Sequence, residues 1–197
     1  MLPTKNRSRF LRLLKWLLIS FLGCWFISQA SVSADDTADR RIQISLPVFP
    51  RIVAVDNDFK QKLLNNNKVL LVFLYEVDKD KAKSMAESLD GKLTNVAGMG
   101  FSTAILSVAE QLRGGATVPT ALFVAEPLTE QAFAPVVEYC IQQHRILFSP
   151  YAGDVERGAM AGIAIGSRVK PFFNMKSLQR AGISINSVLL NLSKRYE

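Results

Sequence analysis

A glycine-rich stretch near the C-terminus has the composition of a phosphate-binding loop. Within SPYAGDVERGAMAGIAIGSRVKPFFN, residues 149–174, lie four of the chain's eleven glycines: Gly153, Gly158, Gly162 and Gly166. A P-loop has Gly-x4-Gly followed by Lys and Ser or Thr, because the lysine and the hydroxyl supply positive charge and a magnesium ligand. Here the second glycine is followed by Ala159 and Met160, and the signature Gly-x-Gly-x-x-Gly is absent. We therefore interpret these glycines as a turn and as close packing between strands.

Cys140 and His144 are spaced four residues apart, so a helix would place both on one face. That spacing is compatible with a thiolate–imidazole pair or with part of a metal site. A zinc site needs three or four protein ligands, however, and His144 is the only histidine. Cys140 lies among Val136, Val137 and Ile141, the setting of an inert buried thiol. We predict no catalytic, metal or cofactor residues, and no enzymatic activity.

Four polar or aromatic residues lie at the end of the apolar segment RILFS, which is predicted to be a strand, and in the loop after it. They are Ser149, Tyr151, Asp154 and Arg157. Ligands of open α/β sheets bind beyond the carboxyl ends of the strands, so these side chains are candidates for contact with a partner or a small solute. The alternative is a solvated turn that holds an arginine–carboxylate pair. The sequence leaves both interpretations open.

Buried strands alternate with amphipathic helices through most of the chain. The predicted strands are VLLVFLY, AILSV, TALFVAE and RILFS, and the predicted helices between them include DKDKAKSMAESLDG and TEQAFAPVVEYCIQQH. Continuous apolar strands of this kind are usually buried on both faces by helices. The alternation therefore predicts an α/β fold, a single Rossmann-like three-layer lobe with a mainly parallel sheet.

The start of the mature part is predicted to be a flexible lead over residues 31–40, which are poor in apolar side chains. After it, RIQISL alternates apolar and polar residues up to Pro47, which predicts a half-buried strand. Residues 41–197 are long enough for one core and too short for two, so we predict a single α/β domain.

The first thirty residues have the layout of a secretory signal peptide. Five basic residues precede an apolar run from Trp16 to Ser28, and small residues follow it. This run is shorter than the roughly 20 residues of a membrane-spanning helix. Cleavage is predicted after Ala30, with Ala34 as the alternative, and a lipoprotein anchored through Cys24 is a further alternative. We expect a periplasmic protein whose mature form does not span a membrane.

The positive charge of the chain belongs largely to this signal. Residues 1–30 hold five of the 24 Lys and Arg residues and none of the 17 Asp and Glu residues, so cleavage lowers the net charge from +7 to +2. The mature part has no basic block with interleaved aromatic residues. Nucleic acid is therefore not expected as a partner.

The C-terminal segment NMKSLQRAGISINSVLL resembles the ending of two related groups of exported proteins. One is the YfiR family of exported repressors, and the other is the C-terminal lobe of ABC-transporter substrate-binding proteins. The residues that carry the resemblance are Asn174, Leu178, Ala181, Gly182, Ile183, Ile185, Leu189 and Leu190. The resemblance implies a Rossmann-like lobe, in agreement with the alternation of strands and helices.

Two functions follow from this resemblance. Similarity to YfiR implies a non-enzymatic regulator that binds the sensor part of an inner-membrane signalling protein, a diguanylate cyclase or a histidine kinase. The alternative is a single-lobe solute-binding protein. YfiR proteins hold cysteine pairs, whereas Cys140 alone would remain after export, so redox control is not implied. A two-lobed receptor would need about twice this length, which favours the regulator; a homodimer is compatible with either function.

Overall fold

The structure is a computed structural model that describes residues 32–113 and 117–197. The predicted signal peptide, residues 1–30, lies outside the described residues. By its internal contacts the chain divides into two units, Met1–Arg40 and Arg41–Glu197. The second of these units is an α/β domain, which confirms the predicted fold class.

The described helices and strands follow one another in an alternating order. The helices are α2 (Val32–Ala54), the 3-10 turn η2 (Phe59–Lys62), α3 (Lys79–Asp90), α4 (Val108–Leu112), α5 (Glu130–Gln142), α6 (Asp154–Arg157), α7 (Met175–Arg180) and α8 (Ser187–Leu192). The strands are β1 (Val69–Tyr75), β2 (Phe101–Ser107), β3 (Ala121–Val124), β4 (Ile146–Ser149), β5 (Ala161–Ile165), β6 (Val169–Asn174) and β7 (Lys194–Tyr196).

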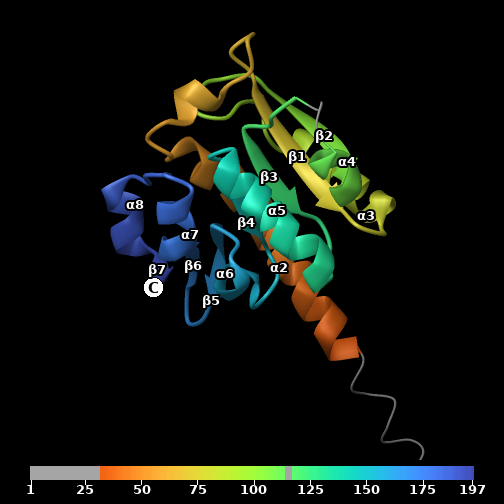
Figure 1. Cartoon of the computed structure of the whole chain (residues 1–197). Coiled ribbons are helices and arrows are strands. Elements are labelled where there is room, and N and C mark those ends of the chain that lie inside the picture. Colours follow the sequence, from red (N-terminus) through yellow and green to blue (C-terminus); the bar gives the residue numbers. More distant parts are fainter. Residues whose placement is uncertain (1–31, 114–116) are drawn as a thin grey trace, which may run out of the picture. The chain divides into compact units, whose positions relative to one another are not determined.

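The strands form one sheet in the order β2-β1-β3-β4-β5-β6-β7 (Figure 1). The first five strands of that order run parallel to one another. β6 pairs antiparallel with β5, and β7 pairs parallel with β6, so the last two strands run in the opposite direction. The mainly parallel sheet is therefore confirmed.

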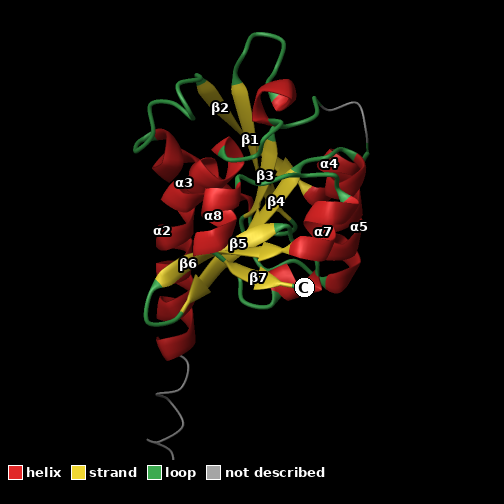
Figure 2. Ribbon diagram, turned by 90° about the vertical axis from the view of Figure 1, so that its left-hand side faces the viewer, coloured by secondary structure: helices red, strands yellow, loops and turns green. Residues whose placement is uncertain are grey.

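Helices cover both faces of the sheet (Figure 2). Seen along the sheet, α2 and α3 lie on one side, and α4, α5 and α7 lie on the other. Such covering explains why β3 and β4 are buried at every residue. Capping side chains begin several of these helices where the sequence indicates: Asp78 accepts from the Lys81 amide before α3, and Asn174 accepts from the Ser177 amide before α7.

The largest difference from the sequence-based expectation lies at the start of the domain. RIQISL was predicted to be a strand, and this prediction is wrong, because these residues belong to helix α2. Ile42, Leu46, Phe49 and Val53, which recur every three or four residues, are all buried, as the apolar face of a helix should be. The six-residue window is too short to distinguish this period from simple alternation.

Two prolines lie inside α2, Pro47 and Pro50, and each removes one hydrogen bond of the helix. Burial of the apolar face of α2 offsets that loss. The helix also includes residues 32–40, which were predicted to be a flexible lead. Apolar residues do not recur at helical spacing in residues 32–40, so a prediction from hydrophobic periodicity does not identify this part of the helix.

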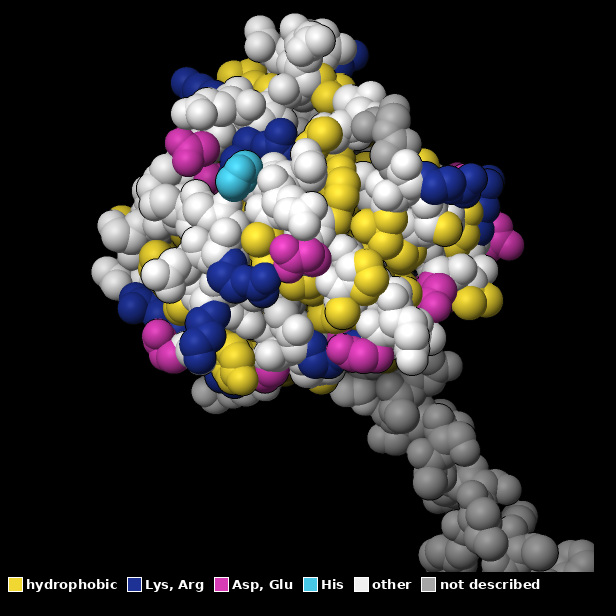
Figure 3. Space-filling view, in the orientation of Figure 1, with side chains coloured by type: hydrophobic (Ala, Val, Ile, Leu, Met, Phe, Trp, Pro, Cys, Tyr) yellow, Lys and Arg dark blue, Asp and Glu magenta, His cyan; other side chains and the backbone are white. Residues whose placement is uncertain are grey.

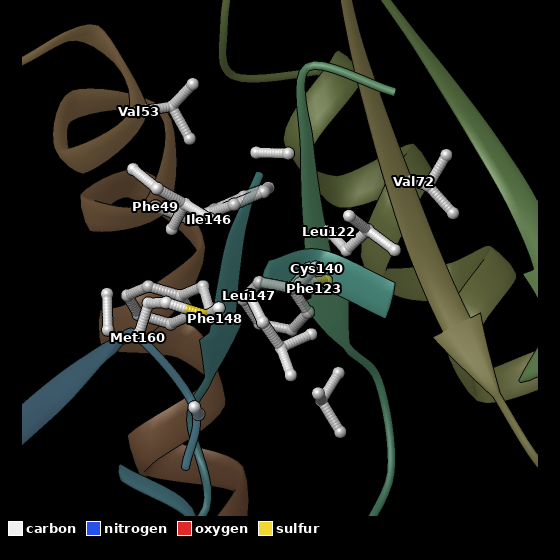
Figure 4. Packing of buried hydrophobic residues seen from close by; sticks show 14 of the residues in the cluster. Phe49, Val53, Val72, Leu122, Phe123, Cys140, Ile146, Leu147, Phe148 and Met160 are labelled. Atoms are coloured by element: carbon white, nitrogen blue, oxygen red, sulfur yellow. The ribbon is translucent and has the colours of Figure 1, made fainter. Parts of the chain in front are cut away.

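Four phenylalanines form the centre of the core between α2 and the sheet. Phe49 of α2 has its ring centroid 5.3 Å from that of Phe123 and 5.5 Å from that of Phe148. Phe123 stacks on Phe148 at 5.4 Å, and Phe73 lies 5.2 Å from Phe123. Figure 4 shows how Phe49 reaches from its helix toward the strand residues. All four rings are fully buried, so this cluster holds α2 on the sheet.

Candidate functional site

The loops that follow β1, β3 and β4 lie at the carboxyl edge of the parallel strands. The strand order β2-β1-β3-β4-β5 reverses its direction of growth between β1 and β3. In open α/β sheets the crevice at such a switch point is the usual place for a ligand. We therefore define the candidate site as the carboxyl edge, made of these three loops.

At the switch point, the side-chain carboxylate of Glu126 accepts hydrogen bonds from the backbone amides of the loop after β1. Oε1 of Glu126, in the loop after β3, accepts hydrogen bonds from the amides of Glu76, Val77 and Asp78 at 2.6, 2.6 and 2.9 Å. In return, Glu76 accepts from the amide and the hydroxyl of Thr129, both at 2.8 Å. The amides that an anionic ligand would use are therefore already bonded within the chain.

Sequence reasoning missed this pair of glutamates. Glu76 and Glu126 lie 50 residues apart, so no local spacing connects them. The available signal in the sequence is that each glutamate comes shortly after a buried apolar strand. Glu76 follows β1 directly, and Glu126 is the second residue after β3. Only the pairing of those two strands brings the glutamates together.

The predicted residues Ser149 and Asp154 are buried and bonded to each other. The Ser149 hydroxyl donates to Oδ2 of Asp154 at 2.6 Å and accepts from the amide of Tyr151 at 3.1 Å. Burial raises the pKa of Asp154, while the hydrogen bond from Ser149 and the charge of Arg157 act in the opposite direction. The side chains of Ser149 and Asp154 therefore stabilise the conformation of the β4 loop, because they hydrogen-bond to each other.

Arg157 and Tyr151 complete the network at the surface. Arg157 donates from Nη1 to Oδ1 of Asp154 at 2.9 Å and from Nη2 to Oε2 of Glu130 at 2.7 Å. Its guanidinium also lies 4.4 Å from the ring centroid of Phe133. The hydroxyl of Tyr151 donates to the carbonyl oxygen of Ala125 at 2.7 Å, which ties the β4 loop to the β3 loop.

The structure thus brings the four predicted residues together in one network. This network contains the arginine–carboxylate pair that one of the two sequence-based interpretations expects. Contact with a partner or solute stays a prediction for these residues. On the face of the molecule drawn in Figure 3, Lys and Arg side chains are interspersed with Asp and Glu side chains.

The raised pKa of Asp154 predicts a pH effect on stability. A carboxyl whose pKa is higher in the folded than in the unfolded state stabilises the fold fully below its unfolded pKa, and this contribution is lost as the pH rises through the folded pKa. We expect the free energy of unfolding of the wild type to fall, relative to that of Asp154→Asn, as the pH rises from about 3 toward 7. Urea denaturation at several pH values measures this difference. If the difference in unfolding free energy between the wild type and Asp154→Asn stays constant with pH, or changes in the opposite direction, the pKa of Asp154 is not raised by burial.

A separate hollow of about 170 Å³ opens beside the β4 loop. Its apolar and aromatic lining residues include Val155, Ile163, Tyr151 and Phe172. The charged residues in its lining are Arg41, Glu156 and Lys194. Of the four predicted site residues, Tyr151 alone is part of this lining, and Ala152 and Gly153 of the same loop join it.

Arg41 is anchored at the wall of this hollow. Its Nε donates to the carbonyl oxygen of Pro150 at 2.8 Å, and its Nη2 donates to that of Ile163 at 3.0 Å. Partial burial lowers the pKa of Arg41, and the charge of Glu156 acts in the opposite direction. Sequence reasoning missed Arg41 as a site residue, because Arg41 was placed in a strand that does not form. Glu156 was noticed with Asp154 and Arg157 as a charged residue of the β4 loop, but it was not among the four predicted contact residues.

The glycines of residues 149–174 lie at a turn and in a strand, as predicted. Gly153 and Gly158 have left-handed backbone angles, with φ of +89° and +130°, and flank the single turn of α6. Gly162 lies in β5, opposite Ser149 of β4. This arrangement positions the β4 loop and the hollow beside it.

Cys140 and His144 do not share a helix face. Helix α5 ends at Gln142, and His144 lies beyond it with a φ of +57°. Nδ1 of His144 donates to the carbonyl oxygen of Ala181 at 2.7 Å, which ties the end of α5 to α7. Burial raises the pKa of the Cys140 thiol, so it stays protonated. Both side chains are parts of the packing.

Within residues 32–113 and 117–197, no three His, Cys, Asp or Glu side chains are grouped as a metal ion would require. The helices described in those ranges are also too short or too polar to cross a membrane.

Comparison with known proteins identifies the fold. No protein-family model matches the chain, and neither does any curated protein. Several solved structures have a similar fold, among them the following two. The structure of "the ABC domain in complex with L-Trp" from Streptococcus pneumonia is 17% identical, with a TM-score of 0.50 over 74% of this chain and 60% of that one. A ligand-free, open substrate-binding protein with adhesive properties from Clostridium difficile is 15% identical, with a TM-score of 0.51 over 73% of this chain and 60% of that one.

The chain resembles a substrate-binding protein in its fold. It spans about 60% of the length of either similar structure. At this level of identity the likeness concerns the fold alone. It agrees with the Rossmann-like lobe that the C-terminal residues imply.

Proposed function

We propose that this protein is a non-enzymatic binding domain that takes a small zwitterionic solute, of the size of an amino acid, into the hollow beside the β4 loop. The observation that carries this proposal is the composition of the hollow, in which Arg41 and Glu156 provide opposite charges on walls that include Tyr151 and Phe172.

Each group of such a solute finds a complementary side chain. The guanidinium of Arg41 has a fixed orientation, since it already bonds two backbone carbonyls, and guanidinium groups bind carboxylates well. The carboxylate of Glu156 can accept hydrogen bonds from an ammonium group. The rings of Tyr151 and Phe172 offer apolar area to the remainder of the solute.

The size of the hollow limits the solute. Pockets for drug-sized molecules measure roughly 300–1,000 Å³, and the hollow holds about 170 Å³. A nucleotide is therefore too large to be enclosed, whereas an amino acid fits at least in part.

The comparisons support a solute more than a signalling partner. The two similar structures are named for a complex with L-Trp and for substrate binding. Export through the predicted signal peptide would bring the domain into contact with solutes of the periplasm. The carboxyl edge, in contrast, has its amides occupied by Glu126, so the hollow is the better candidate.

Titration calorimetry with a panel of neutral amino acids, including L-tryptophan, tests this function. We expect at least one of them to bind with a dissociation constant below about 1 mM. Glu156→Gln should weaken that binding more than about tenfold, because it removes the charge that faces the ammonium group. The N-acetylated form of the same amino acid should bind the wild type as weakly as the free amino acid binds the variant.

Glu138→Gln is the matched control, since Glu138 lies on α5 and pairs with Arg180 outside the hollow. This variant should bind like the wild type. Absence of binding by the whole panel, or equal affinities for Glu156→Gln and the wild type, would overturn the proposal.

The regulator function that the resemblance to YfiR implies stays a prediction. It is checked by pull-down of the processed protein with sensor domains of inner-membrane signalling proteins. A solute that raises the melting temperature in the absence of any protein partner favours the solute-binding function instead, because a ligand stabilises the form that it binds.

A further inference from the structure

The two edges of the sheet differ in how they are protected. One edge is β7, a strand of three residues that begins with Lys194 and Arg195 and is exposed throughout. The other edge is β2, a strand of seven residues, and β1 is its only partner among the described strands. Short edge strands and edge lysines prevent pairing with other chains. β7 has both features and β2 has neither.

The sequence of β2, FSTAILS, suits strand pairing. It contains no charged residue and no proline, and each of its residues is partly exposed. Its faces are covered, because α3 contacts it on one side and α4 follows it on the other. As the edge strand, β2 also has amide and carbonyl groups of alternate residues that point away from β1.

We propose that β2 is a dimerisation edge, at which β2 of a second copy of this chain pairs antiparallel about a two-fold axis through Ala104. In this register Phe101 lies opposite Ser107 of the second copy, and Thr103 lies opposite Ile105. Because β2 contains no charged residue, pairing two copies of it brings no like charges together, and the same edge can serve both copies. One continuous sheet then runs through both copies.

Charge complementarity on α3 favours a second copy as the occupant of this edge. On the face of α3 that includes Asp90, the N-terminal half carries Lys79 and Lys83 and the C-terminal half carries Glu87. Asp80 and Lys81 lie off this face, and Nζ of Lys81 lies 5.8 Å from the ring centroid of Tyr151. A two-fold axis places two copies of α3 antiparallel, so the basic half of each faces the acidic half of the other.

The position of α3 allows these helices to meet. Asp90 at the end of α3 accepts a hydrogen bond from the Thr103 hydroxyl of β2 at 2.8 Å, so α3 lies directly over the edge. With paired strands about 4.8 Å apart, two helices placed between β1 and β2 of their own copies lie on the order of 10 Å apart. That is close to the distance at which helices pack.

Sedimentation velocity of the protein, purified after its processing in the cell, tests the dimer. The wild type should dimerise at a concentration on the order of 100 µM. Ala104→Lys and Ala104→Glu should each weaken dimerisation at least tenfold, because the two-fold axis places like charges directly opposite each other. An equimolar mixture of the two variants should form dimers again, since opposite charges then meet at the axis.

Tyr196→Lys is the matched control, because it adds the same charge to the opposite edge strand; it should dimerise like the wild type. Hydrogen exchange provides a measurement that needs no variant: amides of residues 101–107 should exchange more slowly at high than at low concentration of the wild type. A monomeric wild type, or variants that dimerise individually as well as in the mixture, would overturn the proposal. The solute test is independent, since the hollow lies toward β5, β6 and β7.

Discussion

Replacing Phe49 by alanine is expected to lower the free energy of unfolding by about 3–5 kcal/mol. Phe49 is fully buried, and its ring contacts those of Phe73, Phe123 and Phe148, which belong to three neighbouring strands. Truncation leaves a cavity at the point where α2 meets the sheet. Strands and helices around that point cannot close the cavity without moving, so most of the cost remains.

Urea denaturation measures this loss, and Arg51→Ala on the same helix is the control. Arg51 is exposed, so its replacement should change stability by no more than about 0.5 kcal/mol. If Phe49→Ala cost as little as Arg51→Ala, α2 would not be part of the core. The outcome matters for the hollow too, because Arg41 in its wall belongs to the same helix.

Gly162→Ala is expected to cost about 3 kcal/mol, because β5 approaches β4 too closely for a side chain. A Cβ atom at this position would lie 2.7 Å from the carbonyl oxygen of Ser149 and 2.8 Å from Cγ2 of Val155. The first of these is a backbone atom of the neighbouring strand, so the strand itself would have to shift. The larger Gly162→Val substitution should cost at least as much, whether or not a ligand is present.

Gly166→Ala provides the comparison for this prediction. No atom lies within 4 Å of a Cβ at Gly166, so alanine there should be neutral or slightly stabilising. Denaturation curves of the two alanine variants should therefore differ clearly in midpoint. A Gly162 variant with unchanged stability and a loss of nucleotide affinity would instead show that this glycine serves phosphate binding.

The α/β alternation was predictable because β1, β3 and β4 are continuous apolar runs and because α3 and α5 each have an apolar face with the helical period. β1 and α3 illustrate this, since Asp78 and Gly91 mark the two ends of α3 as well. The prediction of RIQISL as a strand was wrong because Ile42 and Leu46 fit both the strand and the helix period over six residues, and Ile44 completed an alternation between apolar and polar residues. Phe49 and Val53 carry the helical period, but Pro47 separates Phe49 from the earlier residues and Pro50 separates Val53 from Phe49.

Part of the site was also predictable. The sequence identified a loop at the carboxyl edge, because the candidate residues lie at the end of a predicted strand and just after it. In the structure they form one network there: Ser149, Tyr151, Asp154 and Arg157. Whether they contact a ligand depends on which polar atoms are already bonded within the chain. Asp154 and Ser149 bond each other, and that is a property of the folded loop.

By itself, the sequence determined the class of the fold, the mainly parallel sheet and the packing role of its glycines, because these depend on periods and local spacings. Only the tertiary structure decided which distant residues meet. It brought Glu126 to the backbone amides after β1, it brought Arg41 into the same hollow as Glu156, and it left β2 at the edge of the sheet. These juxtapositions depend on strand order and on the packing of α2, which no local pattern encodes.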